Sequence, residues 1–434
     1  MQSVFKLIIV TVPVIVFLFY FPYTKSKPAS ILTAFFLLII LTIFIVNIGK
    51  ETYKNYRQTP IWDFQVFWLD GKVALTGRNF YDAKNYQAMS LPFNPGDDFK
   101  KEIIDVGFKY PPFTMFFFLP LGLFDISKAY ILWQILNLLV CAGCIYGIWK
   151  LFLYDYGVLS LLLVAMLMLG LEPVRSTFSF SQTNFLVLSL FLLFWRNKSK
   201  GWSGIWLALC VVIKPYMALL YIYPLITRKW KMLAIAVLTL LAITFLSVLA
   251  FGPDVFVSFF NNPASKVPSY LYTEGVNQSL LATILRLFPN QLKKGPLFLN
   301  PLYLGISFIL TLITAWAASM KKNSEEWVIL SIIFLALIIY PASLEHYSVF
   351  LIIPVVLLFR QSSENVMGRI YIFSIILVTY FLSGYDSGYY MFFVNIFMWF
   401  ICIILETRLS LVAFMHSIVT ENQYLGELSL YKEL

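Results

Sequence analysis

The segment ILTAFFLLIILTIFIVNI, residues Ile31–Ile48, is an uninterrupted apolar run without a charged side chain. A helix needs about 20 mainly apolar residues to cross the hydrocarbon core of a bilayer, so this run is long enough to span a membrane. Further runs of the same kind follow it along most of the chain. Because a helix satisfies all its backbone hydrogen bonds internally, the sequence predicts an all-α, polytopic membrane protein.

The composition agrees with this interpretation. The chain has 434 residues, of which 60% are hydrophobic and only 12% are charged, and its mean hydropathy is +0.80. A soluble domain carries roughly 25% charged residues, so most of this surface is expected to face lipid. The net charge of +10 is attributed to basic cytoplasmic loops, and the lipid bilayer rather than a nucleic acid is the expected partner. Residues 1–434 are predicted to form a single integral-membrane domain.

The apolar runs predict about eleven membrane spans, together with re-entrant or half-helices. The distribution of Lys and Arg places the long polar segments 49–110 and 252–297 outside and the tail 406–434 in the cytoplasm. We therefore expect a multi-pass protein of the plasma membrane. The predicted spans are Val4–Tyr20, Ile31–Ile48, Ala129–Trp149, Gly157–Gly170, Phe185–Trp195, Met232–Phe251, Leu304–Met320, Trp327–Tyr340, Tyr347–Phe359, Ile370–Leu382 and Met391–Leu405.

Two apolar segments do not fit a simple crossing. Pro111–Phe124 is short, and it is predicted either to dip into the membrane and return or to pack against the outer face. Trp202–Thr227 lies between the basic runs RNKSK and RKWK and is interrupted at Lys214-Pro215, which predicts two half-helices that meet there. A lysine at that depth is costly unless it faces a polar cavity, and a side chain that extends to the interface is the alternative.

The first long outer segment opens with PIWDFQVFWLDGKVALTGRNFYD, residues Pro60–Asp82. Helical spacing places its large apolar residues, together with one glycine, on one face of a helix that ends at Gly77. That face consists of Phe64, Phe67, Trp68, Gly71 and Leu75. Asp63 is either the N-cap of this helix or a functional carboxylate presented to the water side.

The unusual polar residues fall in segments assigned to the outer side. They combine carboxylates, cations, amides and one of the two histidines of the chain. Polar loops are common in any protein, but this combination supplies both a general base and groups that can bind phosphate. The residues are Asp63, Asp70, Arg175, Gln182, Asn184, Asn277, Gln278, Arg286, Glu345 and His346, with Lys214 reaching toward them.

Motifs for cofactors are absent from the sequence. There is no Walker A pattern, no Gly-rich dinucleotide turn and no HExxH. The four cysteines lie in apolar runs, and no cluster of cysteine and histidine completes a metal site. We therefore expect no cofactor and no metal.

Six motifs occur in order over about Asp63–Pro354. They are WDF at Trp62–Phe64 with the helix that continues to LTGRNFYD, FKYPPF at Phe108–Phe113 with PLGLF at Pro120–Phe124, SQTNFLVLSLF at Ser181–Phe191, GIWLALCVVIKP at Gly204–Pro215, NQSLLATILRL at Asn277–Leu287, and SLEHYSVFLIIP at Ser343–Pro354. In these motifs the chain resembles the polyprenyl-phosphate-mannose-dependent glycosyltransferases of glycosyltransferase family 87, which have the GT-C membrane architecture. The resemblance implies a GT-C-like fold. It also implies transfer of a hexose, with mannose favoured, from a polyprenyl-phosphate sugar to a glycan or glycolipid acceptor on the outer, non-cytoplasmic face.

The resemblance further implies roles for single residues. Asp63 matches the family's early-loop aspartate, which acts as the general base, and His346 matches its late-loop histidine near the donor. Ser181 stands where family members usually have Gly, and Glu345 stands where an aromatic residue is common. The positions matched to the donor and its phosphate are Lys214, Arg286, His346, Asn277 and Gln278. The positions left for the acceptor or for secondary roles are Asp70, Gln182, Asn184, Glu345 and Arg175.

The chemistry of such a transfer suits these residue types. A lipid phosphate is a stable anionic leaving group, so an inverting attack needs one carboxylate as base and cations or hydrogen-bond donors around the phosphate. A metal ion is dispensable if side chains supply these contacts. Two other activities stay open: a flippase or transporter that binds a lipid-linked sugar without reacting, and a polymerase or ligase of lipid-linked glycans.

Overall fold

The computed structural model describes residues 27–57, 62–82, 84–85, 108–261, 272, 275–290, 299–320, 325–362 and 390–407. Within these ranges the regular structure is helical, and the one β-type pairing is an isolated antiparallel bridge between Asn277 and Leu344. The all-α prediction is therefore confirmed for the described part of the chain. The predicted spans Val4–Tyr20 and Ile370–Leu382 lie outside the described residues.

The described helices occur in the following order along the chain. The N-terminal half contains α2 (Lys27–Arg57), α3 (Trp62–Leu75), η2 (Pro112–Thr114), α6 (Met115–Phe118), η3 (Leu119–Leu123), α7 (Ile126–Ile148), η4 (Trp149–Leu153), η5 (Tyr154–Tyr156), α8 (Val158–Gly170), α9 (Glu172–Ser179) and α10 (Asn184–Arg196). The middle contains η6 (Gly201–Ser203), α11 (Gly204–Ile213), η7 (Pro215–Tyr221), α12 (Ile222–Ile226), α13 (Trp230–Phe251) and α14 (Pro253–Asn261). The remainder contains α15 (Leu280–Leu287), α16 (Pro301–Ser319), α17 (Glu325–Ile339), η12 (Glu345–Leu351), α18 (Ile352–Ser362) and α20 (Tyr390–Thr407).

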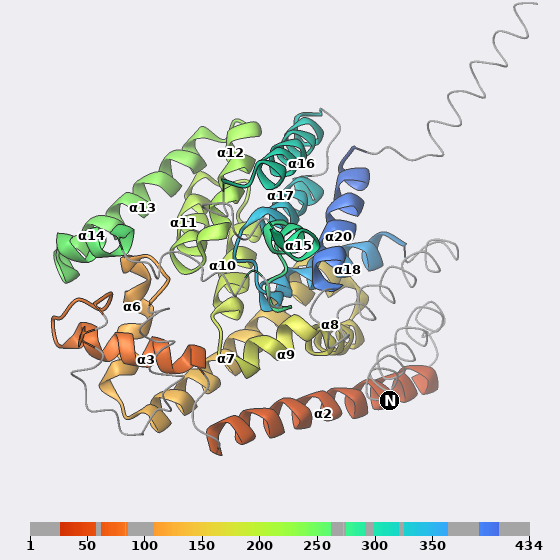
Figure 1. Ribbon diagram of the computed structural model, residues 1–434. Helices are drawn as coiled ribbons and strands as arrows, with labels where there is room; N and C mark the ends of the chain where they lie inside the picture. Colours follow the sequence, from red (N-terminus) through yellow and green to blue (C-terminus); the bar gives the residue numbers. More distant parts are fainter. Residues whose placement is uncertain are drawn as a thin grey trace, which may run out of the picture.

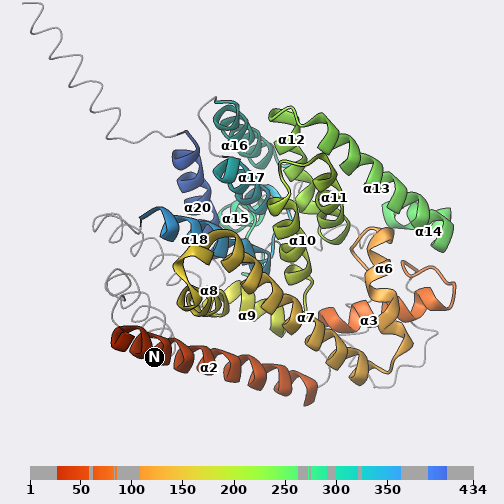
Figure 2. The same cartoon turned by 180° about the vertical axis from the view of Figure 1, so that it is seen from behind.

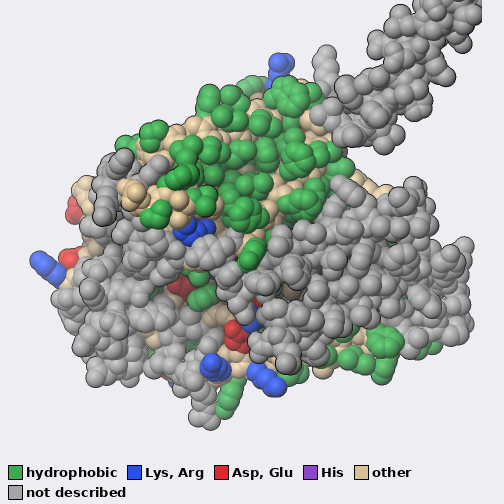
Figure 3. All heavy atoms as spheres, turned by 45° about the vertical axis from the view of Figure 1, so that its right-hand side comes forward, with side chains coloured by type: hydrophobic (Ala, Val, Ile, Leu, Met, Phe, Trp, Pro, Cys, Tyr) green, Lys and Arg blue, Asp and Glu red, His purple; other side chains and the backbone are tan. Residues whose placement is uncertain are grey.

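The helices surround a central group formed by α10, α11 and α17. Figures 1 and 2 show α13 and α14 on one side of this group, α16 and α20 on the other, and α2 along the lower edge beneath α8 and α9. A large apolar core runs through this arrangement and includes nearly all of α17. Apolar side chains on α13, α16 and α20 remain exposed, and Figure 3 shows a broad apolar area over the upper part of one face, with acidic and basic side chains below it.

Five described helices are long and apolar enough to cross a membrane. They are Ala34–Lys54, Ile126–Tyr156, Trp230–Phe251, Pro301–Ser319 and Tyr390–Thr407. A sixth crossing results if α8 and α9 form one span, although the chain bends there by 65°. Other apolar segments, such as α10 and α11, are shorter helices. The chain is thus a multi-pass membrane protein, while the predicted count of about eleven spans is not confirmed.

The first polar segment folds as the sequence predicts, with one exception. Helix α3 ends at Leu75, and Gly77 follows with a φ of 71°, a conformation that glycine adopts without strain. Phe64, Phe67 and Trp68 are buried, but Leu75 is 41% exposed. This exposure is the exception, since Leu75 keeps the predicted helical spacing but is not covered by neighbouring segments as the other three are.

A neighbour of α3 is the short segment predicted from Pro111–Phe124. It forms η2, α6 and η3 and packs against α3, and its predicted dip into the membrane or packing on the outer face stays a prediction. Gly71 of α3 and Gly122 of η3 touch through their backbones, since a Cβ atom on Gly122 would lie 2.6 Å from the carbonyl carbon of Gly71. Stacking of Phe67 on Phe118, with ring centroids 4.2 Å apart, extends this contact. The two segments therefore pack together through their backbones and their aromatic rings.

The predicted break at Lys214-Pro215 is confirmed. Helix α11 ends at Ile213, Lys214 is extended with φ −136° and ψ 105°, and η7 begins at Pro215. A proline removes a backbone donor and disfavours helical geometry in the residue before it, which explains both the interruption and its position. Thr114 Oγ1 donates to Val212 O at 2.6 Å, so η2 is attached to α11 directly beside the break.

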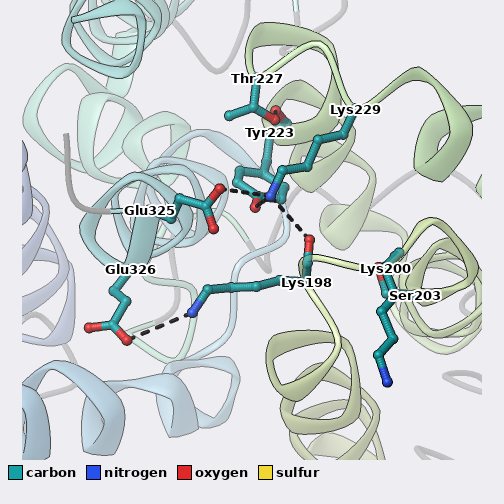
Figure 4. Close-up of polar contacts among 8 residues, drawn as sticks. All are labelled: Lys198, Lys200, Ser203, Tyr223, Thr227, Lys229, Glu325 and Glu326. Carbon is teal, nitrogen blue, oxygen red and sulfur yellow. Dashed lines mark hydrogen bonds and ion pairs between the residues drawn. The ribbon is translucent and has the colours of Figure 1, made fainter. Parts of the chain in front are cut away.

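A polar cluster lies at the ends of the central helices that are opposite to the break at Lys214-Pro215. Lys229 Nζ donates to Glu325 Oε1 at 2.7 Å and to Lys198 O at 3.1 Å, and it also contacts Tyr223 Oη (Figure 4). Lys198 Nζ lies 3.7 Å from Glu326 Oε1. We call these five residues the Lys229 cluster. It connects the end of α10 and the turn before α13 to the start of α17.

Candidate active site

The corner between α9 and α10 is held by side chains of α7. Ser181 has a φ of 52°, a left-handed conformation that glycine adopts more easily than serine does. Trp133 Nε1 donates to Ser181 O at 2.6 Å, and Gln134 Nε2 donates to Ser181 Oγ at 2.8 Å. Gln182 N donates to Thr177 O at 2.9 Å. The corner explains why glycine suits position 181, and it fixes the direction of the next side chain.

Gln182 joins two of the predicted site residues. Its Nε2 donates to Asp63 Oδ2, and its Oε1 accepts from Lys214 Nζ at 3.0 Å. The three residues come from α3, the α9–α10 corner and the break after α11, which are far apart in the sequence. Asp63 is inside the first turn of α3 rather than before it, so it is not the N-cap. A carboxylate in this first turn interacts favourably with the helix dipole.

Lys214 is buried among neutral groups. Only 1% of the residue is exposed. Its Nζ donates to Tyr110 Oη at 2.9 Å, and it lies 5.1 Å from the ring centroid of Tyr110 and 4.2 Å from that of Tyr347. Among the described residues no carboxylate lies within ion-pair distance of this ammonium group. The aromatic faces and dipoles stabilise its charge without neutralising it.

Tyr110 and Tyr347 were not among the predicted site residues. Tyr110 lies in the FKYPPF motif and Tyr347 directly follows His346, so both were quoted only as parts of motifs. Burial raises the pKa of the Tyr110 phenol, and the nearby charge of Asp63 raises it further. Tyr110 therefore stays protonated and can keep a hydrogen-bonding hydroxyl beside both Asp63 and Lys214.

His346 lies at the start of η12 and is buried. Its ring packs against Phe180, 5.9 Å away, and Tyr347, 5.1 Å away. Burial lowers the pKa of His346, and the positive charge of Lys214 lowers it further. At neutral pH this imidazole is uncharged, so it can form hydrogen bonds but adds no positive charge. Within the described part of the chain its buried Nε2 has no hydrogen-bond partner.

The predicted amides Asn277 and Gln278 bind backbone groups. Asn277 Nδ2 donates to Pro341 O at 3.0 Å, and Gln278 Oε1 accepts from Phe392 N at 2.8 Å. Gln278 N also donates to Ser343 O at 2.6 Å. Both residues are fully buried. They thus attach the loop before α15 to the segment that carries His346, and their predicted contact with phosphate stays a prediction.

Arg286 forms hydrogen bonds with the loop before α15 and with α15 itself. Its Nη1 donates to Asn277 O at 2.8 Å, and its Nη2 donates to Thr283 Oγ1 at 3.2 Å. The structure therefore places Arg286 on α15 as a support of the Asn277 backbone. Its proposed contact with the donor phosphate is a prediction that these bonds leave open.

Two further predicted residues connect α9 to its neighbours. Asn184, the first residue of α10, donates through Nδ2 to Thr177 Oγ1 at 3.0 Å. Glu345 Oε1 accepts from Ser176 Oγ at 2.9 Å and so links η12 to α9. Both contacts hold α9 against its neighbours α10 and η12, which carry or adjoin Gln182 and His346.

Arg175 and Asp70 lie away from the Asp63–Gln182–Lys214 bridge. Arg175 forms an ion pair with Glu172 on its own helix and lies 3.9 Å from Glu51 of α2. Asp70 is buried two turns beyond Asp63 on α3. Burial raises the pKa of Tyr81, and the charge of Asp70 raises it further, which places Asp70 beside that phenol. No direct contact of either residue with the bridge is observed in the described residues.

The arrangement combines a carboxylate, a cation held by neutral partners and a neutral imidazole. We call Asp63, Gln182, Lys214, Tyr110 and His346 the outer site. Groups of three or more His, Cys, Asp or Glu that could hold a metal ion do not occur among the described residues. The carboxylate can accept a proton and the ammonium can bind an anion, which are the two requirements of transfer from a phosphate leaving group. Fold and site together define a multi-pass membrane protein whose described residues form helices and bring a carboxylate, a buried ammonium group and a neutral imidazole together.

Comparison with known proteins identifies its family. The model of glycosyltransferase family 87 matches residues 108–341, which is more than half of the chain, and the chain belongs to this family. No solved structure gives a significant match.

Curated relatives agree with this assignment. The chain is 30% identical over 252 residues to the polyprenol-phosphate-mannose-dependent alpha-(1-2)-phosphatidylinositol pentamannoside mannosyltransferase of Mycolicibacterium smegmatis, covering 56% of this chain and 59% of the relative. It is 25% identical over 293 residues to the protein of the same description from Mycobacterium tuberculosis, covering 64% and 66%. It is 26% identical over 210 residues to an alpha-(1->3)-arabinofuranosyltransferase of Mycobacterium tuberculosis, covering 46% and 48%. The chain thus spans about half to two thirds of the length of these relatives.

Proposed function

We propose that this protein is an inverting membrane glycosyltransferase that moves a hexose, with mannose favoured, from a polyprenyl-phosphate sugar to a glycan or glycolipid acceptor. The observation that carries the proposal is the bridge in which Gln182 contacts both Asp63 and Lys214. It brings a possible base and an unneutralised cation to one place. Membership of glycosyltransferase family 87 supports the reaction class. The names of two relatives support the mannosyl donor, and the name of a third, an arabinofuranosyltransferase, keeps a pentose as the alternative sugar.

In the proposed reaction Asp63 accepts the proton of the acceptor hydroxyl. The acceptor oxygen then forms a bond to the anomeric carbon from the side opposite the phosphate, which inverts the configuration. The bond between the anomeric carbon and the phosphate oxygen breaks, and its electron pair leaves with the lipid phosphate. Lys214 stabilises the charge that develops on this phosphate, and neutral His346 forms a hydrogen bond to the same group.

We place the outer site on the non-cytoplasmic face of the plasma membrane. Gln182, Lys214 and His346 lie at one end of α10, α11 and η12, whereas Lys198 and Lys229 lie at the other end of the central helices. A helix the length of α10 separates them by about 20 Å, given a rise of 1.5 Å per residue. Basic residues mark the cytoplasmic side in membrane proteins, which assigns the opposite end to the outside.

The test compares Asp63→Asn with Asp70→Asn in purified protein supplied with polyprenyl-phosphate mannose and a panel of glycolipid acceptors. Loss of a general base costs roughly 10²–10⁴-fold in rate, so Asp63→Asn should lose nearly all transfer while Asp70→Asn loses far less. Both amides keep the shape of the carboxylate, and thermal stability is measured alongside the initial rates. Wild-type activity in Asp63→Asn would disprove the role of Asp63 as base.

The main alternative is a flippase or transporter of lipid-linked sugars, because Lys214 could bind a phosphate that never reacts. Labelled donor in liposomes separates the two activities. A transporter moves the donor across the bilayer and leaves it intact, whereas a transferase consumes it only when an acceptor is present. The position of Asp63 beside the same cation favours the transferase.

A further inference from the structure

We propose that Gln182 is a positioning residue that holds Asp63 and Lys214 in contact with one amide while preventing them from forming an ion pair. The inference rests on the proposed role of Asp63 as base and concerns how that base keeps its basicity. It assigns to Gln182 a task other than contact with the acceptor.

A side-chain amide carries an acceptor oxygen and a donor NH₂ group at fixed positions on one carbon. Its Nε2 faces the carboxylate of Asp63, and its Oε1 faces the ammonium of Lys214 at 3.0 Å. The two charges determine this orientation, since the reversed amide would place its oxygen against the carboxylate and its NH₂ group against the ammonium. Neither a carboxylate nor an apolar side chain can make both bonds.

Direct contact between Asp63 and Lys214 would harm both of their proposed tasks. An adjacent cation stabilises the charged form of a carboxylate, so Asp63 would become a weaker base. Lys214 would be neutralised by Asp63 and would bind the donor phosphate less well. With Gln182 between them, each group has a hydrogen-bond partner that carries no net charge.

The chain at Ser181 and Gln182 is held by three hydrogen bonds, which fix the point from which the Gln182 side chain starts. Trp133 and Gln134 of α7 bind Ser181 O and Ser181 Oγ, and Thr177 O accepts from Gln182 N. Gln182 is itself buried. Such anchoring suits a group whose task is to keep a separation rather than to bind a variable substrate.

The titratable groups that face this pair from the surrounding elements are few within the described ranges. Tyr110 faces Asp63 and Lys214 from the segment before η2, and Tyr347 of η12 senses Asp63. His346 of η12 faces Lys214, and Asp70 lies two turns away on α3 itself. Among these groups Lys214 carries the opposite charge to Asp63, so its distance contributes to how readily Asp63 takes up a proton.

The experiment measures the pH dependence of the transfer rate for Gln182→Glu and Gln182→Leu. In Gln182→Glu a second carboxylate faces Asp63, which raises the pKa of the base. The acidic limb of the kcat profile should move to higher pH by about one unit or more, and activity should recover as the pH rises. In Gln182→Leu the separating amide is gone and Lys214 can pair with Asp63. The limb should move to lower pH, and the KM for donor should rise several-fold.

Asn395→Leu is the control, because it removes another buried amide that donates to Ser348 Oγ at 3.0 Å. It should lower the thermal stability without moving the acidic limb. An unmoved limb in a folded Gln182→Glu variant, while Asp63→Asn is inactive, would overturn the role of Gln182 and leave the proposed function intact. Full activity in Asp63→Asn would instead remove the proposed function. If Gln182→Leu does not fold, Gln182→Glu, which has the same length, decides the question.

Discussion

Lys214 and Lys229 lie at opposite ends of the same central helices, and both make three or more polar or aromatic contacts. Lys229 is paired with a carboxylate, since its Nζ lies 2.7 Å from Glu325 Oε1, and the pair is partly exposed. Lys214 is almost fully buried and contacts an amide, a phenol and two aromatic rings. The charge of Lys229 is neutralised by a carboxylate of the protein. The charge of Lys214 is solvated only by an amide, a phenol and aromatic rings.

In the proposed function, this difference separates a structural lysine from a functional one. A buried charge without a counter-ion costs free energy, and a fold retains it where an anion is to be bound. A charge that is already paired contributes to the assembly of the helices, and its attraction for a ligand is weak. The Lys229 cluster therefore serves as the reference against which the outer site can be tested.

Among the changes that compare the two lysines, the largest effect is expected from Lys214→Met. Methionine keeps the length and the apolar stem but removes the charge that would face the donor phosphate. A hydrogen bond to a charged group contributes about 1.5–3 kcal/mol, so kcat/KM for polyprenyl-phosphate mannose should fall roughly 10–100-fold. Because the cost of burying a charge is removed as well, the melting temperature should stay unchanged or rise. A lower melting temperature together with an unchanged kcat/KM would make Lys214 structural.

The matched change at the other cluster is Lys229→Met, with the opposite pattern. It leaves Glu325 without its cation and removes the donor to Tyr223 Oη and Lys198 O. Since the ion pair is partly exposed, we expect a loss of about 1–2 kcal/mol in stability and a lower melting temperature. Transfer activity, measured below that temperature, should remain near that of the wild type. Equal activity losses in Lys214→Met and Lys229→Met would abolish the distinction between the two ends.

The smallest effect is expected at Ser181, and it tests how firmly the outer site is held. Ser181→Gly relieves a left-handed conformation worth about 1–2 kcal/mol but loses the hydrogen bond from Gln134, worth about 1 kcal/mol. Ser181→Ala loses the hydrogen bond and keeps the strain. Chemical or thermal denaturation should therefore show Ser181→Gly to be more stable than Ser181→Ala by about 1 kcal/mol or more. Equal stability of the two variants would show that the corner carries no strain.

Much of the fold was predictable because apolar runs and prolines act locally. The start and end of α13 and the interruption at Lys214-Pro215 follow from hydrophobicity and from the missing amide hydrogen of proline. The end of α8 at Gly170 was predicted, but the helix α9 that follows it after a bend of 65° was missed, although Pro173 stands at its start. The span count exceeded what the described helices support because several apolar runs form short helices packed inside the protein.

The site was predictable as a set of residues but not as a set of contacts. An amide such as Asn277 can bind a ligand or a backbone carbonyl, and only the fold decides which groups lie near it. The same holds for Gln182, whose partners are 119 and 32 residues away. Tyr110 was missed because its phenol meets Lys214 across 104 residues, and no local pattern signals such a contact.

The backbone contact between Gly71 and Gly122 affects the entropy that is lost when the proposed base is positioned for reaction. Since a side chain on either residue would clash with the other segment, α3 is seated on η3 by main-chain atoms, whose positions do not depend on rotamers. Asp63 is carried by the same rigid helix. Its orientation is thus pre-organised during folding, and the entropy of placing it is lost before any substrate arrives. Binding energy from the lipid and the acceptor then remains available for the transition state.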